Sequence, residues 1–467
     1  MQPPASGISH TSRQKLLIHR AHLGSQQLVL AATVGALGGL LFGYDNVVIS
    51  GAIRYVGLYF GLGEVQIGWA AGCALLGCVA GAASAGAVAD WLGLKRGLAI
   101  CAVCFAVSAA GMWSVTSFPQ FVIWRVIGGI GIGAASIIAP MYIAETAPAK
   151  LRGRLVTLYQ FGIVTGILGA VFTNMLIQRL GDEAWNTSAG WRWMFFAGVF
   201  PAVLFFVAII PTVESPRWLM KVGRRSRAVQ VLEKIYPPQE ALAEAAAIEQ
   251  SLAIEEGRFS ELFTSFRRPL LIGMMLAGLS QISGITPLLS FLPGVFRAAG
   301  AATSNAFLQA VLVGMINVAF TAAALWLIDV AGRKTLILSG SALQCLSFAL
   351  VGWLYHVHGP GQGILFFVMA FVAGHAFGNG AACWVVISEI YPTKVRGRAM
   401  SIATTTLWLV GYAGNQLFPV MQKYLGPDGT FWCFSAGALL TMFCVTFLVP
   451  ETKGRTLEQI TALWVRR

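Results

Sequence analysis

Charged residues are scarce in this chain. Only 11% of its 467 residues are Asp, Glu, Lys or Arg, while 57% are hydrophobic and the mean hydropathy is +0.71. Because a soluble domain carries about 25% charged residues, this composition excludes a soluble globular protein and indicates a polytopic membrane protein. The net charge of +13 does not indicate nucleic acid as a partner, because the basic residues lie in short loops between apolar segments.

Groups of metal-binding or catalytic side chains are also lacking. The eight cysteines lie within or at the ends of apolar segments. Cys101 and Cys104 have the spacing of a metal or redox motif, but no histidine is near them, so ordinary packing is the favoured interpretation. Without a nucleophile–base or metal constellation, the sequence predicts no enzyme and no cofactor, and a proton gradient would be the energy source.

Apolar segments long enough to cross a bilayer, at about 20 residues each, occur twelve times in two groups of six. The predicted fold is an all-α polytopic membrane protein with twelve transmembrane helices in two six-helix halves. If the N-terminus is cytoplasmic, the cytoplasmic segments hold 26 of the 32 Lys and Arg residues and the outer ones five, which places both termini inside the cell. The predicted parts are a cytoplasmic N-terminal segment (1–27), the first half (28–212), a cytoplasmic linker with short helices (213–268), the second half (269–449) and a cytoplasmic tail (450–467).

One carboxylate stands inside the first apolar segment. Asp45 lies within the glycine-rich stretch from Gly38 to Gly51, and a charge near the bilayer centre costs about 2.5–3.5 kcal/mol on insertion scales. The favoured interpretation is an ion-coupling site, because acids within a membrane are functional by default. A structural ion pair, or an aspartate close enough to the interface to be hydrated, remains open at this point.

Three charged motifs recur between the two halves. Glu145-Thr-Ala-Pro-Ala-Lys-Leu-Arg-Gly-Arg154 returns as Glu389-Ile-Tyr-Pro-Thr-Lys-Val-Arg-Gly-Arg398, with six of ten positions identical. The motif that begins at Asp90 returns at Asp329, and the one that begins at Glu214 returns more loosely at Glu451. Duplicated six-helix halves are typical of transporters whose substrate site lies between the halves.

The repeated charges fall at the cytoplasmic ends of the predicted helices. An acid there can pair with an arginine of a neighbouring loop, which predicts a salt-bridge network that latches the two halves when the outer side is open. The alternative is that the charges are topology signals with weak surface pairing. The predicted members of this network are Asp90, Arg96, Glu145, Arg152, Asp329, Arg333, Glu389 and Arg396.

Six motifs together carry a family resemblance: Gly39-Leu-Leu-Phe-Gly-Tyr-Asp45, Arg125-Val-Ile-Gly-Gly-Ile-Gly131, Met141-Tyr-Ile-Ala-Glu145, Glu214-Ser-Pro-Arg-Trp-Leu219, Asp329-Val-Ala-Gly-Arg333 and Pro450-Glu-Thr-Lys-Gly454. With them, nearly the whole chain resembles the sugar porters of the major facilitator superfamily. The stretches Ile123–Gly131 and Val313–Phe320 look most like bacterial xylose–proton symporters. The resemblance implies twelve helices, alternating access and a place in a bacterial inner membrane.

The resemblance also implies a partner for Asp45. In proton-coupled members the corresponding aspartate works with an arginine of helix 4, which is matched here by Arg125. A carboxylate beside an arginine stays ionised, and one that loses this contact in a low-dielectric interior takes up a proton more readily. Proton coupling is therefore the favoured role of Asp45 and Arg125, and a permanent pair that only joins two helices is the alternative.

Sugar binding needs amide and hydroxyl groups for the ligand's hydroxyls and an aromatic face for its C–H surface. The resemblance implies such a site between the halves. The residues that it points to are Phe42, Gln160, Gln281, Thr286, Asn317, Gly380, Trp384 and Trp408.

Several positions depart from the family's pattern. Ser280, Thr286 and Ser290 of helix 7 stand where the family has Gln, Asn and Tyr, and Ile167 and Leu407 stand where many members have polar residues. Each lost partner leaves a ligand hydroxyl unpaired, at a cost of about 1–3 kcal/mol. Helix 10 also lacks a usual proline, and this absence predicts a stiffer helix.

The leading hypothesis is a proton-coupled symporter for a small sugar or polyol. A uniporter, or a carrier of a less hydroxylated non-sugar solute, stays open because of the altered helix 7. A non-transporting substrate sensor is disfavoured, since sensors usually carry long signalling tails. The expected partners are the substrate, a proton and the lipid bilayer, and the expected state is a monomer.

Overall fold

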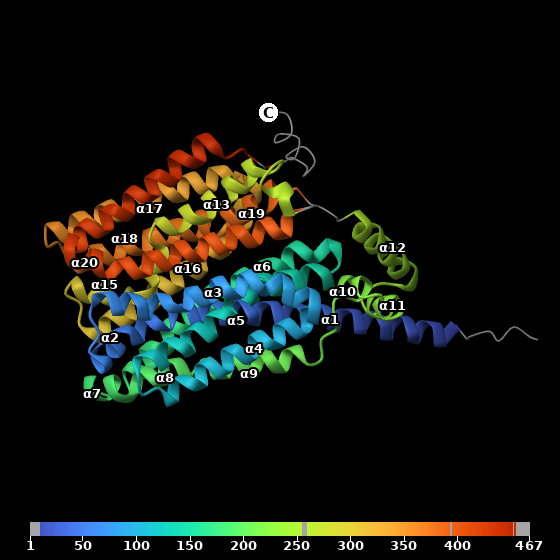
Figure 1. Ribbon diagram of the computed structural model, residues 1–467, viewed down its shortest axis with the longest axis horizontal. Helices are drawn as coiled ribbons and strands as arrows, with labels where there is room; N and C mark the ends of the chain where they lie inside the picture. The colour runs from blue at the N-terminus through green and yellow to red at the C-terminus, as the bar shows by residue number, and fades with distance from the viewer. Residues whose placement is uncertain (1–9, 255–258, 393–394, 452, 454–467) are drawn as a thin grey trace, which may run out of the picture.

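The computed structural model describes residues 10–254, 259–392, 395–451 and 453, and regular structure in these ranges is helical throughout (Figure 1). Eleven helices of this part of the chain are long and apolar enough to cross a membrane. The last of them, α20 (Arg396–Leu448), is interrupted at Gly426, whose φ of 74° and ψ of 170° are not helical. Because α20 therefore supplies two crossings, the described chain contains the twelve predicted spans.

The first half has six spans. The first is formed by α1 (His10–Val47) and α2 (Ile49–Phe60), and the sixth by α8 (Trp191–Phe196) and α9 (Val199–Ile209). The described part of the predicted segment 1–27 is helical and continuous with the first span. The remaining elements of this half are α3 (Glu64–Leu92), α4 (Leu94–Gly111), η1 (Met112–Ser114), α5 (Phe118–Thr146), α6 (Ala149–Gln178), α7 (Glu183–Trp185) and η2 (Asn186–Gly190).

The predicted linker folds into short helices with a core of their own. Leu219, Met220, Leu232 and Ala245 form its centre and are buried. The Tyr236-Pro-Pro238 sequence separates the second helix from the third, because proline can begin a helix but cannot continue one. The linker elements are α10 (Pro216–Lys221), α11 (Arg225–Leu232), α12 (Pro238–Ile254) and η3 (Phe259–Leu262).

The spans of the second half are interrupted more often. The seventh span breaks at Gly284, whose φ of 89° is a left-handed conformation that glycine adopts without strain. It consists of α13 (Arg267–Ile282), α14 (Ile285–Ser290) and α15 (Leu292–Ala298). The other elements before α20 are α16 (Thr303–Ala331), α17 (Arg333–His356), α18 (Gly361–Gly374), η4 (His375–Gly380) and α19 (Ala382–Ile390).

The tenth span is not a regular helix, although it lacks the proline. Its middle segment, η4, is π-helical. The amide of Asn379 in η4 donates to Gln344 Oε1 at 2.7 Å and to Ser341 Oγ at 3.2 Å, both on α17. The expectation of a stiffer helix 10 stays a prediction, and the π-helical segment shows that this span is interrupted without a proline.

Glycines allow the spans to pack closely. A Cβ on Gly77 of α3 would lie 2.3 Å from the carbonyl oxygen of Val126 on α5, and a Cβ on Gly133 of α5 would lie 2.0 Å from that of Cys78 on α3. Any larger side chain at these positions would push the two helices apart. Small residues at helix contacts are typical of membrane proteins, and the 53 glycines of the chain agree with this.

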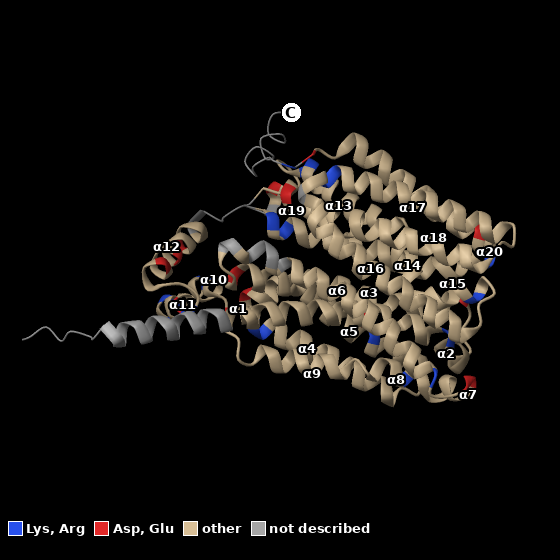
Figure 2. Ribbon diagram, turned by 180° about the vertical axis from the view of Figure 1, so that it is seen from behind, with Lys and Arg blue, Asp and Glu red and all other residues tan. Residues whose placement is uncertain are grey.

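The two halves lie side by side, and the linker helices stand at one end of the molecule (Figure 1). We call this the linker end, and we call the opposite end, which carries α2, α7 and α15, the distal end. Figure 2 shows that the coloured charged residues gather toward these two ends, with a mostly uncharged band between them. This distribution is the one expected of a protein that crosses a bilayer.

Candidate functional site

A charged pair lies within the membrane-spanning part of the first half. Nη1 of Arg125 on α5 lies 3.2 Å from Oδ2 of Asp45 on α1, and the same nitrogen donates to the main-chain carbonyl of Asp45 at 3.2 Å. The Arg125 side chain is 1% exposed and that of Asp45 is 15% exposed. The pairing that the sequence predicts is therefore confirmed, while its role in proton coupling stays a prediction.

The surroundings hold the arginine more firmly than the aspartate. The guanidinium of Arg125 lies over the ring of Phe195, 5.3 Å from its centroid. A Cβ on Gly128 would lie 3.3 Å from Oδ2 of Asp45 and 2.6 Å from Oγ of Ser108, so only glycine leaves room for the carboxylate here. Nε of Arg125 is buried without a hydrogen-bond partner in the described part of the chain. The described residues therefore leave the guanidinium incompletely hydrogen-bonded, and a buried polar group without a partner calls for an explanation.

Three aromatic side chains from the two halves contact one another close to the Asp45–Arg125 pair. The ring centroid of Phe42 on α1 lies 5.4 Å from that of Trp408 on α20 and 6.5 Å from that of Tyr159 on α6. Phe42 precedes Asp45 by three residues, so it lies one turn away on the same helix. The structure therefore brings two predicted substrate residues, Phe42 and Trp408, into contact across the interface between the halves.

Two hydrogen-bond donors of this aromatic group lack acceptors. Nε1 of Trp408 and Oη of Tyr159 are buried, and neither has a partner among the described residues. A buried donor without a partner costs about 1–3 kcal/mol, so a ligand with hydroxyl groups would be stabilised by accepting these bonds. Tyr159 was not predicted as a site residue. Its position next to Gln160 was the signal available in the sequence.

The seventh span holds its two predicted site residues together. The hydroxyl of Thr286 donates to Oε1 of Gln281 at 2.5 Å, across the break at Gly284. Nε2 of Gln281 has only a long contact, of 3.4 Å, with Oγ of Ser280. The Gln281 amide nitrogen is therefore available to a ligand, whereas its carbonyl oxygen is already bonded to Thr286.

The remaining predicted substrate residues are less closely connected. Asn317 on α16 is 5% exposed, and no hydrogen bond of its amide is present in the described part of the chain. Gly380 ends η4, and Trp384 on α19 packs half-buried against the apolar cluster that contains Trp408. Gln160 on α6 is half-buried. Among the contacts described, none joins Gln160, Asn317 or Gly380 to the aromatic group.

At the linker end, the described partners of the predicted network include one pair within the network and contacts with the linker. Arg333 pairs with Glu389 at 3.3 Å, which is a pair within the predicted network and within the second half. Asp90 instead pairs with Lys221 of α10 at 2.7 Å, because the linker packs against the end of α3. Glu145 accepts a hydrogen bond from Oγ of Ser215.

The other members of the predicted network lie apart from these pairs. Arg96 is exposed and takes part in no described pair. Arg396 donates to the main-chain carbonyl of Tyr391, with both contacts at 3.3 Å. The side chains of Arg152 and Asp329 lie outside the described residues. The pairs described at this end lie within the second half or join the first half to the linker, so the latch between halves stays a prediction for a conformation with an open outer side.

The third repeated motif has the same structural role in both halves. Glu214 accepts from the main-chain N–H of Lys95 at 3.0 Å, and Glu451 accepts from that of Lys334 at 3.3 Å. Both lysines also donate to carbonyl groups at the end of a neighbouring span. The repeat of these glutamates is visible in the sequence, but their binding to the start of the next helix is not.

The distal end is closed by contacts between the halves. Glu64 of α3 pairs with Lys423 of α20 at 3.0 Å, and Nε2 of Gln416 donates to the carbonyl of Val65 at 2.8 Å. A Cβ on Gly68 would lie 2.4 Å from the carbonyl oxygen of Gln416, so the two helices nearly touch there. This closure could not be predicted from the sequence, since the residues involved are more than 340 positions apart.

Comparison with known proteins agrees with this architecture. Residues 31–464 match the family model described as sugar (and other) transporter. The chain is 37% identical over 465 residues to the D-xylose-proton symporter of Escherichia coli (strain K12), which covers 92% of this chain and 94% of that protein. It is 36% identical over 442 residues to the arabinose-proton symporter of Bacillus subtilis (strain 168), with 94% and 95% covered.

A solved structure of the xylose transporter of E. coli, described as partially occluded and inward open, superposes on this one with a TM-score of 0.85. The identity is 34%, and the match covers 92% of this chain and 100% of that chain.

Proposed function

This chain belongs to the sugar (and other) transporter family, and from that premise we propose that it is a secondary active transporter that carries a small sugar or polyol together with a proton. It is a multi-pass membrane protein, and its relatives are transporters rather than enzymes. We place it as a monomer in a bacterial inner membrane, with both termini and the linker end in the cytoplasm. The distal end then faces outward, and no cofactor is needed beside the proton gradient.

The Asp45–Arg125 pair is the observation that carries proton coupling. The Asp45 side chain is 15% exposed, while that of Arg125 is almost fully buried. When Asp45 takes up a proton, Arg125 keeps its bond to the main-chain carbonyl of Asp45 and its position over Phe195. The proton can therefore bind and leave without moving the arginine into the bilayer, where an unpaired charge is costly.

The helix α1 connects this proton site to the substrate. Phe42 lies one turn from Asp45 and contacts Trp408 of the other half at 5.4 Å. A sugar that stacks on these rings and accepts hydrogen bonds from Trp408 and Tyr159 would change how α1 packs between the halves. Substrate binding and protonation of Asp45 then favour the same rearrangement of α1. Coupling requires this, because both ligands must bind one conformation more tightly than the other.

Alternating access follows from the closed distal end. The contacts of Glu64, Gln416 and Gly68 join the halves on the side that we assign to the outside. The solved structure that superposes on this one with a TM-score of 0.85 is described as partially occluded and inward open, so we infer that a substrate between the halves would here exchange with the cytoplasm. To load from outside, α3 and α20 must separate at the distal end while the halves approach at the linker end, as rocking transporters do.

Uptake by purified protein in liposomes tests this function. We expect one or more members of a panel of pentoses, hexoses, polyols and cyclitols to accumulate above the external concentration when a proton gradient is imposed, and only to equilibrate without it. Accumulation that is the same with and without the gradient for every transported compound would exclude proton symport.

A second candidate is a uniporter or carrier of a less hydroxylated solute. It is favoured by the substrate side of the site, where Thr286 already occupies the carbonyl of Gln281. Ile167 and Leu407, at positions that are polar in many members of the family, are 9% and 8% exposed. The same liposome assay, extended to small solutes with one or two hydroxyl groups, separates this candidate from the first.

A further inference from the structure

The π-helical segment η4 begins with a histidine that belongs neither to the proton site nor to the predicted substrate residues. π-helical turns are rare and occur frequently at functional sites. His375 is half-buried and lies one π-helical turn before Gly380, which is a predicted substrate residue. A Cβ on Gly380 would lie 3.4 Å from both Nε2 and Cδ2 of His375. One edge of the imidazole ring therefore stands beside Gly380, on the face of the segment that the family resemblance assigns to the substrate.

The other edge of the ring meets a buried chain of polar side chains. Nδ1 of His375 lies 3.4 Å from Nε2 of Gln344 on α17, and Oε1 of Gln344 accepts from Nδ2 of Asn379 at 2.7 Å. Nδ2 of Asn379 also donates to Oγ of Ser341 at 3.2 Å. The side chains of Gln344, Asn379 and Ser341 are at most 2% exposed. Because Asn379 occupies the oxygen of the Gln344 amide, the nitrogen of that amide is the group that faces the histidine.

This chain decides which nitrogen of His375 carries the proton. An amide nitrogen can only donate, so Nδ1 of His375 accepts, and the proton of the neutral ring then lies on Nε2. The part of the chain that the structure describes offers Nε2 no hydrogen-bond partner. Nε2 is also not fully enclosed, in contrast to the unpartnered donors of Tyr159 and Trp408. The Nε2–H group of His375 is therefore a free and accessible donor.

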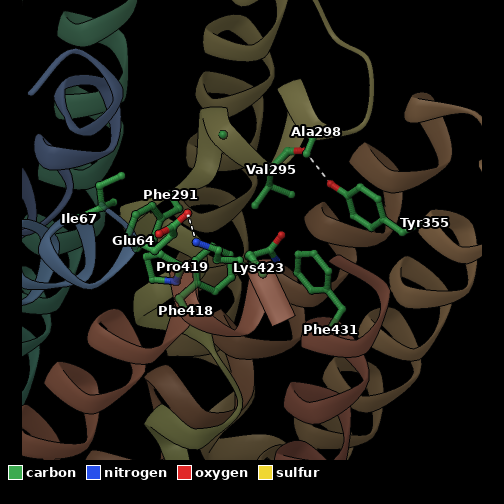
Figure 3. A pocket seen from close by; sticks show the side chains of 12 residues that line it. Glu64, Ile67, Phe291, Val295, Ala298, Tyr355, Phe418, Pro419, Lys423 and Phe431 are labelled. Atoms are coloured by element: carbon green, nitrogen blue, oxygen red, sulfur yellow. Dashed lines mark hydrogen bonds and ion pairs between the residues drawn. The ribbon is translucent and has the colours of Figure 1, made fainter. Parts of the chain in front are cut away.

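Gly380, which has no side chain and is partly exposed, separates this donor from an aromatic ring. Trp384 follows Gly380 by four residues, so it lies about one turn further along the span, where it packs half-buried among apolar side chains. A hydrogen-bond donor and an aromatic face are the groups that a sugar site needs. The distal end is closed by the Glu64–Lys423 pair (Figure 3), so a ligand would reach His375 from the linker end.

We propose that His375 is a specificity-determining residue of the transport site, and that its Nε2–H donates a hydrogen bond to a hydroxyl group of the substrate. This inference rests on the proposed function, because it needs a hydroxylated substrate between the halves. Gln344 is a positioning residue, since it keeps the proton of His375 on Nε2, and Asn379 holds the Gln344 amide in place. A solute without a hydroxyl group at this point leaves the donor unpaired, so His375 favours polyhydroxylated ligands.

NMR of the full-length protein in lipid nanodiscs, labelled with ¹⁵N-histidine, tests the position of the proton without any ligand. The chain has six histidines, and the signals that disappear in His375→Phe are those of His375. We expect a protonated Nε2 and an unprotonated Nδ1 in the wild type, and a mixture of tautomers in Gln344→Met. Gln362→Met makes the same change at an exposed position near the start of α18 and should keep the wild-type signals.

Either of two NMR results would overturn the roles given to these side chains. A proton on Nδ1 of His375 in the wild type would remove the donor from the site. An unchanged tautomer in Gln344→Met would show that Gln344 does not set it.

Contact with the substrate is tested by calorimetry with four probes: D-xylose, L-arabinose, D-glucose and myo-inositol. His375→Phe keeps a flat ring but removes the donor, and it should weaken binding of the tightest probe about 2-fold to 13-fold, as expected for one neutral hydrogen bond. His375→Gln, whose amide nitrogen can stand close to the position of Nε2, should keep most of the wild-type affinity. Equal affinity of the wild type and His375→Phe, or an equal loss in both variants, would overturn the proposal.

Monodeoxy analogues of the tightest probe separate a direct contact from a change of packing. One analogue lacks the hydroxyl group that His375 binds, so His375→Phe should cause no further loss of affinity for it. An equal loss for every analogue would mean that His375 acts only indirectly, against the proposal. If none of the four probes binds to the wild type, the proposed function fails together with this contact, whereas binding that His375→Phe leaves unchanged refutes the contact alone.

Discussion

Replacing Gly68 by alanine should hinder closure of the distal end, because the new methyl group has no space. In the closed structure its Cβ would lie 2.4 Å from the carbonyl oxygen of Gln416 and 3.0 Å from that residue's carbonyl carbon and Cα. All three are main-chain atoms, so no side chain can turn away to relieve the contact. The helices α3 and α20 must therefore move apart at this point.

The size of the effect follows from known costs of overpacking. An extra methyl group in a tightly packed interface costs about 1–3 kcal/mol. The cost applies to the closed distal end and disappears when the halves separate there, so the ratio of closed to open protein should fall about 5-fold to 150-fold. Gly86 lies on the same helix with nothing within 4 Å of its Cβ position, and Gly86→Ala is therefore the matched control.

Hydrogen–deuterium exchange and sugar exchange together measure this shift. In Gly68→Ala, amides of residues 64–72 and 412–423 should exchange faster than in the wild type, and sugar exchange should slow because closure is part of every cycle. Gly86→Ala should leave both unchanged, apart from a gain of up to about 1 kcal/mol in helix stability. If the two variants behave alike, the closure described here does not take part in transport.

Three further substitutions test the site between the halves. Asp45→Asn should abolish uptake against a gradient and retain exchange between equal concentrations, and a variant that still concentrates substrate would place the proton site elsewhere. Trp384→Ala should weaken substrate binding, measured by calorimetry, at least several-fold. This is the loss expected for an aromatic contact worth about 0.5–1.5 kcal/mol beyond its buried area. Unchanged affinity would remove Trp384 from the site. Thr286→Asn places an amide where Thr286 now bonds Gln281 at 2.5 Å. It should strengthen binding of a pentose but not of a solute with one hydroxyl group. Equal changes in affinity for both ligands would contradict the assignment of Thr286 to the substrate site.

The spans could be predicted from the sequence because they depend on a strong local signal, whereas the partner of Asp45 was implied by the resemblance to the sugar porters. Apolar segments of about 20 residues identify the spans, and twelve are present. Asp45 and Arg125 stand out because charges are nearly absent from the spans around them. A charge in such a place needs a partner, and the structure provides it at 3.2 Å.

The partners at the linker end could not be predicted in the same way. Repetition of Asp90, Glu145 and Glu214 in the second half showed that these acids share a role, but not which groups they bind. Asp90 binds Lys221, and Glu145 binds Ser215, because of how the linker packs against the spans. Such packing depends on long-range contacts that leave no period or motif in the sequence.

Interruptions of the spans were also poorly predicted. The interruption of the tenth span has no proline as its signal in the sequence, since η4 is π-helical and is hydrogen-bonded to α17 through Asn379. The unpartnered donors of Tyr159 and Trp408 and the closure at Gly68 depend on how the two halves meet. These features belong to one conformation of the protein. The sequence is the same in every conformation, so it does not specify them.

Proton movement driven by the sugar is the most direct test of proton coupling at Asp45. Liposomes that contain the protein and a trapped pH indicator, with no gradient imposed, receive on the outside a sugar that the uptake panel shows to be carried. The wild type should acidify the lumen as the sugar enters, while Asp45→Asn should cause no acidification, although liposomes preloaded with the same sugar should show that this variant still exchanges it. Sugar entry through the wild type without any change of internal pH, or equal acidification by Asp45→Asn, would contradict the account.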